Sequence, residues 1–237
     1  MSGVLGATGL VLDYGRRPAL RGVDLRVEPG EVLAVTGRSG SGKSSLLLCL
    51  AGVLVPDAGE VRWGDRVVST LPEKERSALR RSEFGVLFQY GQLVSELTAL
   101  DNVALPLLLG GAPRPSAEEV ARSWLDRFGV AALAGARPRE MSGGQAQLVA
   151  VARALVTEPA VLFADEPTGA LDSLAGEDVM AALIETARDQ GTSVVLVTHD
   201  ARVAAYGDRE VEVRDGVVLA DDGLPTGDAV HAMGERS

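Results

Sequence analysis

A glycine-rich segment between an apolar run and a helix-like stretch constrains the fold of this chain most strongly. The segment reads GRSGSGKS at residues 37–44 and follows EVLAVT, a nearly continuous apolar run. Such a run is typical of a buried strand in a parallel sheet. Strand, glycine-rich turn and helix in this order form the context in which backbone N–H groups wrap phosphate oxygens. The pattern therefore predicts an α/β fold with a phosphate-binding loop.

The predicted loop has a distinct task for two of its side chains. Lys43 would bridge the β- and γ-phosphates of a nucleotide, and Ser44 would offer its hydroxyl to Mg2+. The alternative is a glycine-rich turn with an incidental lysine, which the strand and helix on either side argue against. The candidate phosphate-binding residues are Gly37, Arg38, Ser39, Gly40, Ser41, Gly42, Lys43, Ser44 and Ser45.

The composition fits one globular domain and excludes several functional classes. The chain has 237 residues, 46% of them hydrophobic and 24% charged, which is enough for a sizeable core and an inserted subdomain. Its net charge of -10 gives no basic surface for nucleic acid. Cys49 is the single cysteine, so no intrachain disulfide can form, as in a reducing cytosol. We expect Cys49 to be a buried hydrophobe rather than a reactive thiol.

No segment of the sequence predicts a membrane span or a signal peptide. The longest apolar run, SLLLCLAGVLV, is too short and is interrupted by glycine. The first residues lack the basic start and sustained apolar block of a signal peptide. We therefore expect a soluble protein that serves a membrane only through a partner.

The remaining pattern alternates strands and helices around a helical insertion. Strands are expected at residues 10–14, 23–27, 31–37, 84–89, 160–166 and 193–200, with hairpin turns at Gly64-Asp65 and Asp215-Gly216. In the insertion, Asp101 is a candidate N-cap, and Ser116 with Glu119 forms a capping-box pattern before a helix that stops near Gly129. The expected organisation is a single domain: a core with a β subdomain at 1–89 and 158–220, a helical subdomain at 90–157, and a polar tail at 221–237.

Polar residues end three of the predicted strands, where ligands bind in open α/β sheets. Asp165 and Glu166 end AVLFADE; Asp165 would help to bind Mg2+, and Glu166 would orient and deprotonate an attacking water. The alternative is a strand end that simply reaches solvent. His199 is a candidate γ-phosphate contact, or else a hydrogen-bonded residue facing a loop. Gln89 is a candidate for binding Mg2+ or positioning water, or else an ordinary polar residue at a strand end.

A second glycine-rich turn, MSGGQ at residues 141–145, is placed where it can open a helix. Such a turn offers free N–H groups and a hydroxyl to an anion. A chain with one nucleotide cradle has no obvious use for a second anion-facing turn unless another copy supplies the nucleotide. The two turns together therefore suggest an ATPase that works as a dimer.

In this order the motifs resemble the ATP-binding-cassette (ABC) ATPase family over essentially the whole chain. MSGGQ is similar to the family's signature motif, with methionine for leucine, and GALD at residues 169–172 resembles the loop that communicates across the dimer. Gln89 and His199 match the glutamine loop and the switch histidine. Tyr14 matches the aromatic residue that stacks on adenine; the alternative is a tyrosine that covers the end of a strand.

The resemblance implies a fold, cofactors and site roles. The fold would be a P-loop NTPase of ABC ATPase type, with a mainly parallel core sheet, an antiparallel β subdomain and an inserted helical subdomain. ATP and Mg2+ would be the cofactors. Glu166, His199 and Lys43 would be catalytic, and Ser44, Gln89 and Asp165 would hold the metal. From the signature turn, Ser142, Gly143 and Gly144 would contact the γ-phosphate bound to the opposite subunit, and Gln145 would belong to the same nucleotide-binding set.

Two longer segments resemble one branch of the family. FGVLFQYGQLVSELTALDNVALPLLL and ADEPTGALDS are similar to lipoprotein-release, macrolide-export and cell-division ATPases, which pair with separately encoded membrane subunits. The implied partners are transmembrane permease subunits and a second ATPase subunit, identical or different, and no nucleic acid. The implied location is cytoplasmic, on the inner face of the cell membrane, and the implied role is export or lipoprotein release.

Three other functions are weighed against this one. An ABC protein acting on nucleic acid or the ribosome usually has two cassettes or extra domains, and this acidic single cassette has neither. An ABC ATPase that regulates a membrane partner without moving a solute fits the same motifs. A phosphate-loop kinase would leave MSGGQ and His199 unexplained.

One position departs from the family pattern. Gln147 is followed by Leu148, where the family usually has arginine. Either Leu148 is a tolerated apolar residue, or the lost cation weakens the ATPase or makes it asymmetric. We favour tolerance, because Gly37 to Ser44, Asp165, Glu166 and His199 are intact; Ser45, where threonine is common, is a minor change. Trp63 and Trp124 are expected to be packing residues, and His231 part of the tail.

Overall fold

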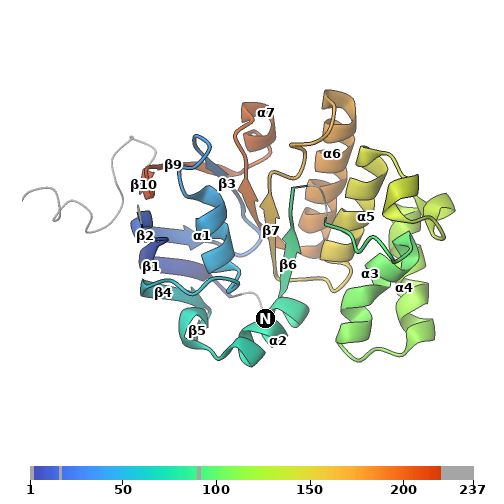
Figure 1. The fold of residues 1–237 in the computed structure, drawn as a ribbon, viewed down its shortest axis with the longest axis horizontal. Helices are drawn as coiled ribbons and strands as arrows, with labels where there is room; N and C mark the ends of the chain where they lie inside the picture. Colours follow the sequence, from blue (N-terminus) through green and yellow to red (C-terminus); the bar gives the residue numbers. More distant parts are fainter. Residues whose placement is uncertain (1–2, 16–17, 90–91, 220–237) are drawn as a thin grey trace, which may run out of the picture. The chain divides into compact units, whose positions relative to one another are not determined.

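The computed structural model describes residues 3–15, 18–89 and 92–219, which form two compact units. Unit 1 combines Met1–Ala78 with Ser193–Ser237, and unit 2 is Leu79–Thr192. Figure 1 traces the helices and strands along the chain. The boundaries of these two units are not those of the predicted core and helical subdomain. They do not test the predicted domain organisation, which stays a prediction. The predicted tail and His231 lie outside the described residues.

Unit 1 contains an antiparallel sheet with the strand order β2-β1-β4-β5. Its strands are β1 (Leu5–Asp13), β2 (Pro18–Val27), β4 (Ala58–Trp63) and β5 (Arg66–Val67). Residues along β1 and β2 mostly alternate between buried and more exposed positions, as expected for strands with one face on the core. The predicted hairpin at Gly64-Asp65 is present, with β4 and β5 paired on either side of it.

A mainly parallel group of strands completes unit 1. β3 (Val32–Thr36) lies between β8 (Ser193–Val197) and β9 (Arg209–Arg214) and is parallel to both. β10 (Val217–Leu219) pairs with β9 through a turn in which Asp215 and Gly216 both have positive φ, which confirms the predicted hairpin. Helix α1 (Lys43–Leu50) contacts β1, β2 and β8. Short helical segments η1 (Val68–Thr70) and α7 (Ala201–Ala204) follow β5 and β8.

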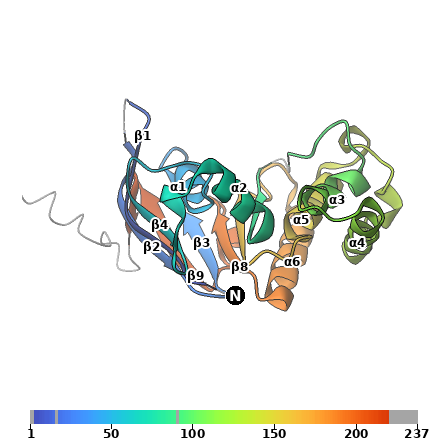
Figure 2. The ribbon, with the colours of Figure 1, turned by 90° about the horizontal axis from the view of Figure 1, so that it is seen from below.

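Helix α2 (Glu73–Ser82) carries the chain into unit 2, which is mostly helical. Its elements are β6 (Phe84–Leu87), α3 (Ala99–Leu109), α4 (Arg114–Arg127), η2 (Ala131–Leu133), η3 (Pro138–Glu140), α5 (Gly143–Leu155), β7 (Val161–Asp165) and α6 (Ser173–Gln190). β6 and β7 are parallel, and the buried rings of Phe84 and Phe163 meet edge to face with centroids 5.2 Å apart. α3 and α4 lie side by side and both contact α5 (Figures 1 and 2).

Two predicted helix starts are wrong because other residues cap the helices. α3 begins one turn earlier than predicted: Thr98 is its N-cap, and Thr98 Oγ1 accepts a hydrogen bond from the backbone N–H of Asp101. α4 begins at Arg114 after an extended Pro113, so Ser116 and Glu119 lie inside the helix rather than forming a capping box. Proline fixes φ and needs no N–H partner at a helix start, which makes it an alternative to a side-chain cap.

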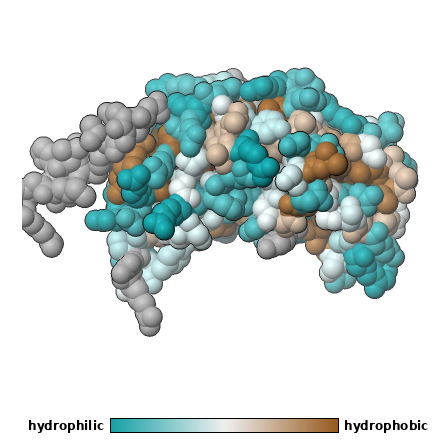
Figure 3. Space-filling model, turned by 90° about the horizontal axis from the view of Figure 1, so that it is seen from above, coloured by the Kyte–Doolittle hydropathy of each residue, from teal (hydrophilic) through white to brown (hydrophobic). Residues whose placement is uncertain are grey.

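The two tryptophans pack as predicted, and the surface drawn in Figure 3 is mixed in hydropathy. Trp63 and Trp124 are buried, as predicted. Figure 3 shows a face on which hydrophilic residues predominate and hydrophobic residues form small groups. Among the described residues, no helix combines the length and apolarity needed to cross a membrane.

Candidate functional site

The predicted phosphate-binding loop joins β3 to α1 in unit 1. Lys43 and Ser41 are buried, while Ser44 is exposed at the start of the helix. Lys43 Nζ donates hydrogen bonds to the carbonyl oxygens of Gly37 at 2.8 Å and Arg38 at 3.1 Å. The side chain of Lys43 therefore folds back onto its own loop. Phosphate oxygens could replace the two carbonyl oxygens as acceptors.

Two glycines of the loop are held against neighbouring backbone. A Cβ on Gly37, whose φ is 139°, would lie 2.2 Å from the carbonyl oxygen of Val213 in β9. A Cβ on Gly42, the N-cap of α1 with φ of 110°, would lie 2.3 Å from the carbonyl oxygen of Ala19 in β2. Only glycine fits both the space and the backbone conformation at these positions.

The interior of the loop contains a polar atom that suits a bound anion. Ser41 Oγ is buried and makes no hydrogen bond to any described residue. A buried hydroxyl in this state is unfavourable, and a ligand oxygen would satisfy it. The hydroxyl, the ammonium group of Lys43 and the N–H groups at the start of α1 form a donor set that fits phosphate.

Tyr14 and His199 belong to the same unit as the loop. The Tyr14 ring is 64% exposed, and its hydroxyl lies 3.5 Å from Ser45 Oγ on α1, so an aromatic face is available beside the loop. His199 is exposed and follows β8, the parallel neighbour of β3. The backbone N–H of Thr198 donates to the carbonyl oxygen of Val35. His199 and the loop therefore leave adjacent strands at the same edge of unit 1.

In unit 2, the predicted carboxylates and Gln89 lie at the ends of the parallel pair β6 and β7. Asp165 ends β7, and Glu166 follows it with φ of 47°. A left-handed conformation is unfavourable for a residue with a side chain and is concentrated at functional sites. The backbone N–H of Gly169 donates to the Glu166 carbonyl, and a Cβ on Gly169 would lie 2.8 Å from Gln89 Nε2. Gln89 therefore packs against the turn that begins at Glu166.

The signature turn caps α5, as predicted. Ser142 Oγ accepts from the backbone N–H of Gln145 at 3.3 Å, and Gln145 Oε1 accepts from the N–H of Ser142 at 2.9 Å, which is a complete capping box. Ser142, Gly143 and Gln145 are exposed. The N-terminal end of a helix dipole thus faces solvent, together with a hydroxyl group, and is suited to an anion.

The signature turn also contacts the segment after Glu166. Cβ atoms on Gly143 and Gly144 would lie 3.3 Å from Leu171 Cδ2 and 3.1 Å from Ala175 Cβ. Small residues are needed there because residues 169–172 and the start of α6 press against the helix. The two motifs that the sequence places 30 residues apart therefore meet inside unit 2.

A side chain that the sequence did not identify as functional links these motifs. Gln147 is 4% exposed, and its Nε2 donates to the carbonyl oxygen of Pro167 at 2.7 Å, next to Glu166. A buried amide on an otherwise apolar helix face is the sequence signal that could have indicated this role. Leu148, the departure from the family pattern, is half-buried.

Each unit therefore carries its own group of predicted site residues. Tyr14, residues 37–45 and His199 are in unit 1, and Gln89, the signature turn, Asp165 and Glu166 are in unit 2. Within the described ranges, no cluster of three or more histidine, cysteine or acidic residues could hold a metal ion by itself. Ser44, Gln89 and Asp165 carry hydroxyl, amide and carboxylate oxygens, the donor types that suit Mg2+. This ion commonly takes only one or two protein ligands and completes its shell with substrate phosphates and water.

Comparisons with known proteins show which family the chain resembles. A family profile described as ABC transporter matches residues 20–169. The macrolide export ATP-binding/permease protein MacB of Rhodopseudomonas palustris (strain HaA2) is 47% identical over 203 residues, which are 86% of this chain and 31% of that protein. The lipoprotein-releasing system ATP-binding protein LolD 2 of Caulobacter vibrioides is 44% identical over 90% of this chain and 95% of its own length.

Comparison with solved structures also finds ABC cassettes. The dimeric structure of MJ0796, a bacterial ABC transporter cassette, has a TM-score of 0.85 and 36% identity, covering 91% of this chain and 97% of that one. Its dimeric post-hydrolysis state, bound to ADP and Pi, has a TM-score of 0.84. The predicted fold class is therefore confirmed. The chain spans about a third of the length of the MacB relative but nearly all of the LolD relative.

Cys49 is expected to be unreactive in the folded chain. It is buried in α1, and burial, with a smaller contribution from Asp57, raises the pKa of its thiol to about 11. At pH 8 roughly one such thiol in a thousand would be ionised, so iodoacetamide should not label it until the pH approaches that pKa. Mass spectrometry measures the labelling, and the chain unfolded in urea is the positive control. Rapid labelling of the folded chain at pH 8 would contradict the burial.

Proposed function

Because the chain belongs to the ABC transporter family, we propose that it is the ATP-binding and ATP-hydrolysing subunit of a membrane ABC transporter. The observation that carries this proposal is the combination of a phosphate loop and an exposed, fully capped signature turn in one chain. The relatives described above include export and lipoprotein-releasing proteins, so export or lipoprotein release is the proposed transport type. Regulation of a membrane partner without solute movement is the alternative.

In the proposed reaction, the loop binds the nucleotide and Glu166 acts on water. Lys43 would exchange its two carbonyl acceptors for β- and γ-phosphate oxygens, while the N–H groups of the loop bind the same anion. The carboxylate of Glu166 would orient the attacking water and accept its proton, and the exposed His199 would contact the γ-phosphate. Tyr14 would stack on adenine.

Ser44, Gln89 and Asp165 are the proposed protein ligands of Mg2+. Their hydroxyl, amide and carboxylate oxygens are the hard donors that this ion prefers. Bound there, the ion would neutralise charge on the phosphates as the terminal bond breaks.

A second cassette, identical or different, would complete each site. The exposed turn formed by Ser142, Gly143, Gly144 and Gln145 would contact the γ-phosphate held by the other subunit. Both structures of the MJ0796 cassette described above are dimeric. Their similarity to this chain supports a dimer here.

The surface of unit 2 after Gln89 is the proposed docking site for a membrane permease subunit. Val94 is 38% exposed in this segment, and Leu109 at the end of α3 is 64% exposed. A partner bound over these side chains would remove their apolar surface from water. Bound there, the chain would be cytoplasmic and peripheral to the inner face of the membrane.

The substitution Glu166→Gln tests the proposed reaction. It removes the proton acceptor but keeps the shape of the side chain, so we expect turnover to fall at least about a hundredfold while ATP affinity is unchanged. Phosphate release measures turnover, and a fluorescent ATP analogue measures affinity. Glu177→Gln, the same change at an exposed position on α6, is the matched control. Unchanged turnover in the Glu166 variant would refute this role.

Two substitutions of Ser142 separate capping from contact with phosphate. Ser142→Ala removes both the cap and the hydroxyl, whereas Ser142→Asp keeps an N-cap acceptor and brings a negative charge toward the anion. We expect both to lower the rate of hydrolysis about tenfold or more, with little change in ATP affinity of the monomer. Near-normal hydrolysis by the aspartate variant would show that Ser142 only caps the helix.

Cysteine crosslinking in membranes tests the docking surface. Val94→Cys and Val53→Cys introduce thiols at positions 38% and 39% exposed, in units 2 and 1, and the native Cys49 is buried. We expect a maleimide that carries a photoreactive group to join the variant at position 94 to a membrane-embedded protein, and to leave the variant at position 53 unjoined. Crosslinking from position 53 alone would place docking elsewhere.

A further inference from the structure

The segment of residues 92–98 has no helix or strand, yet side chains from two helices hold its backbone. We propose that Arg153 and Asn102 are positioning residues for ATP hydrolysis, which clamp this segment and connect it to the helix that carries the signature turn. The inference rests on the proposed function, and it goes beyond it by naming two residues outside the proposed nucleotide-binding set.

Asn102 on α3 holds the second half of the segment. It is fully buried, and its Oδ1 accepts from the backbone N–H of Val94 at 2.8 Å. Its Nδ2 donates to the carbonyl oxygens of Val94 at 3.1 Å, Leu97 at 3.3 Å and Thr98 at 2.9 Å. The side-chain amide of Asn102 thus supplies the hydrogen-bond partners that backbone groups of a helix or strand would otherwise provide. These hydrogen bonds fix the backbone of the segment.

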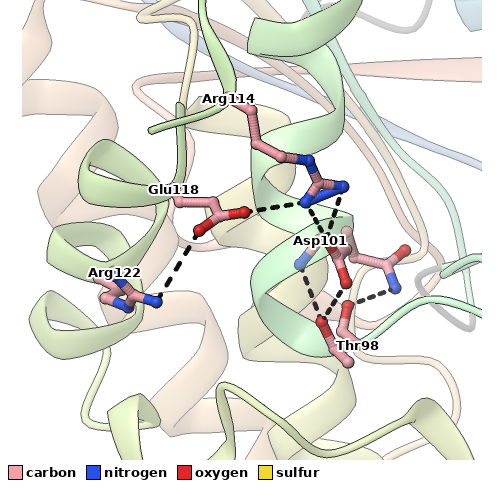
Figure 4. A network of polar contacts seen from close by, with 6 residues as sticks. Thr98, Asp101, Arg114, Glu118 and Arg122 are labelled. Atoms are coloured by element: carbon pink, nitrogen blue, oxygen red, sulfur yellow. Dashed lines mark hydrogen bonds and ion pairs between the residues drawn. The ribbon is translucent and has the colours of Figure 1, made fainter. Parts of the chain in front are cut away.

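The end of the segment is further held by the polar network in Figure 4. Thr98 Oγ1 donates to the Asp101 carboxylate at 2.7 Å, and Arg114 pairs with Asp101 at 3.2 Å and with Glu118 at 2.8 Å. Arg114 thereby ties α4 to the first turn of α3. The buried Asn102 consequently lies on a helix whose start is fixed from two sides.

Arg153 holds the beginning of the segment. Its Nη1 donates to the carbonyl oxygen of Gln92 at 3.0 Å, and burial lowers the pKa of its guanidinium group. Gln92 has φ of 45°, an unfavourable conformation for a residue with a side chain, which persists only where its surroundings support it. In the sequence, the contact lies three residues after Gln89.

The position of Arg153 gives the contact a mechanical consequence. Arg153 is in the last turn of α5, and Ser142 caps the first turn of the same helix. A helix of 13 residues is a stiff rod about 20 Å long. A displacement of the segment at Gln92 would then be transmitted along the helix to the signature turn. The exposed Val94 lies in the same segment, on the surface proposed for docking of a permease subunit.

The purified chain with MgATP is sufficient to test this inference. Arg153→Gln removes the charged donor, and Arg153→Lys keeps one. Arg127→Gln is the matched control, because Arg127 is on α4 in the same unit and pairs with Asp189. We expect Arg153→Gln to lower kcat about tenfold with an unchanged KM for ATP, since the phosphate loop is in the other unit. The lysine variant should recover most of kcat, and the control should match the unaltered chain.

Hydrogen exchange provides a second, independent measurement. In Arg153→Gln, the amides of residues 93–97 should exchange about tenfold faster, whereas the Gln145 amide in the capping box should not change. Unchanged exchange would overturn the clamp, and faster exchange with unchanged kcat would overturn its role in hydrolysis. If the unaltered chain hydrolyses no ATP, the proposed function fails and the catalytic role of Arg153 with it, while exchange still decides whether Arg153 holds the segment.

Discussion

The absence of room for a side chain at Gly37 and Gly42 is the constraint on which the phosphate loop depends. Carbonyl oxygens from β9 and β2 occupy the positions that Cβ atoms would need. Strands of unit 1 thus restrict the backbone of the loop at two points, which helps to arrange its donors for a phosphate group. Lys43 and Ser41 remain the parts that a phosphate group would change, because one side chain bonds loop carbonyls and the other is buried without a described partner.

In unit 2, polar side chains instead form hydrogen bonds with backbone atoms of segments that lack regular secondary structure. Gln147 holds Pro167 beside Glu166, Asn102 holds residues 94–98, and Arg153 holds Gln92. Backbone groups in loops must find partners, and a side chain from a rigid helix supplies them at a fixed position. Such loops can present exposed residues in a defined geometry without belonging to a sheet or helix.

The parts predicted from sequence are those encoded by neighbouring residues. The strand, loop and helix around Gly37, the hairpin at Asp215-Gly216 and the helix start at MSGGQ all depend on a few consecutive residues. The predicted starts of α3 and α4 were wrong because Thr98 and Pro113 compete with equally plausible caps nearby. The roles of Gln147, Asn102 and Arg153 depend on which loop each helix meets, and periodicity carries no such information.

Leu148, which stands where the family usually has arginine, can be interpreted from the contacts of helix α5. In α5, which the structure describes in full, Arg153 is the one charged residue. With leucine at position 148, the first half of the helix is coupled to its surroundings by the Gln147 amide and by the close contacts of Gly143 and Gly144. The remaining cation is in the last turn, where the helix dipole favours it. With leucine at position 148, the helix keeps a charged contact at its C-terminal end, where Arg153 donates to the carbonyl oxygen of Gln92 on the proposed docking surface.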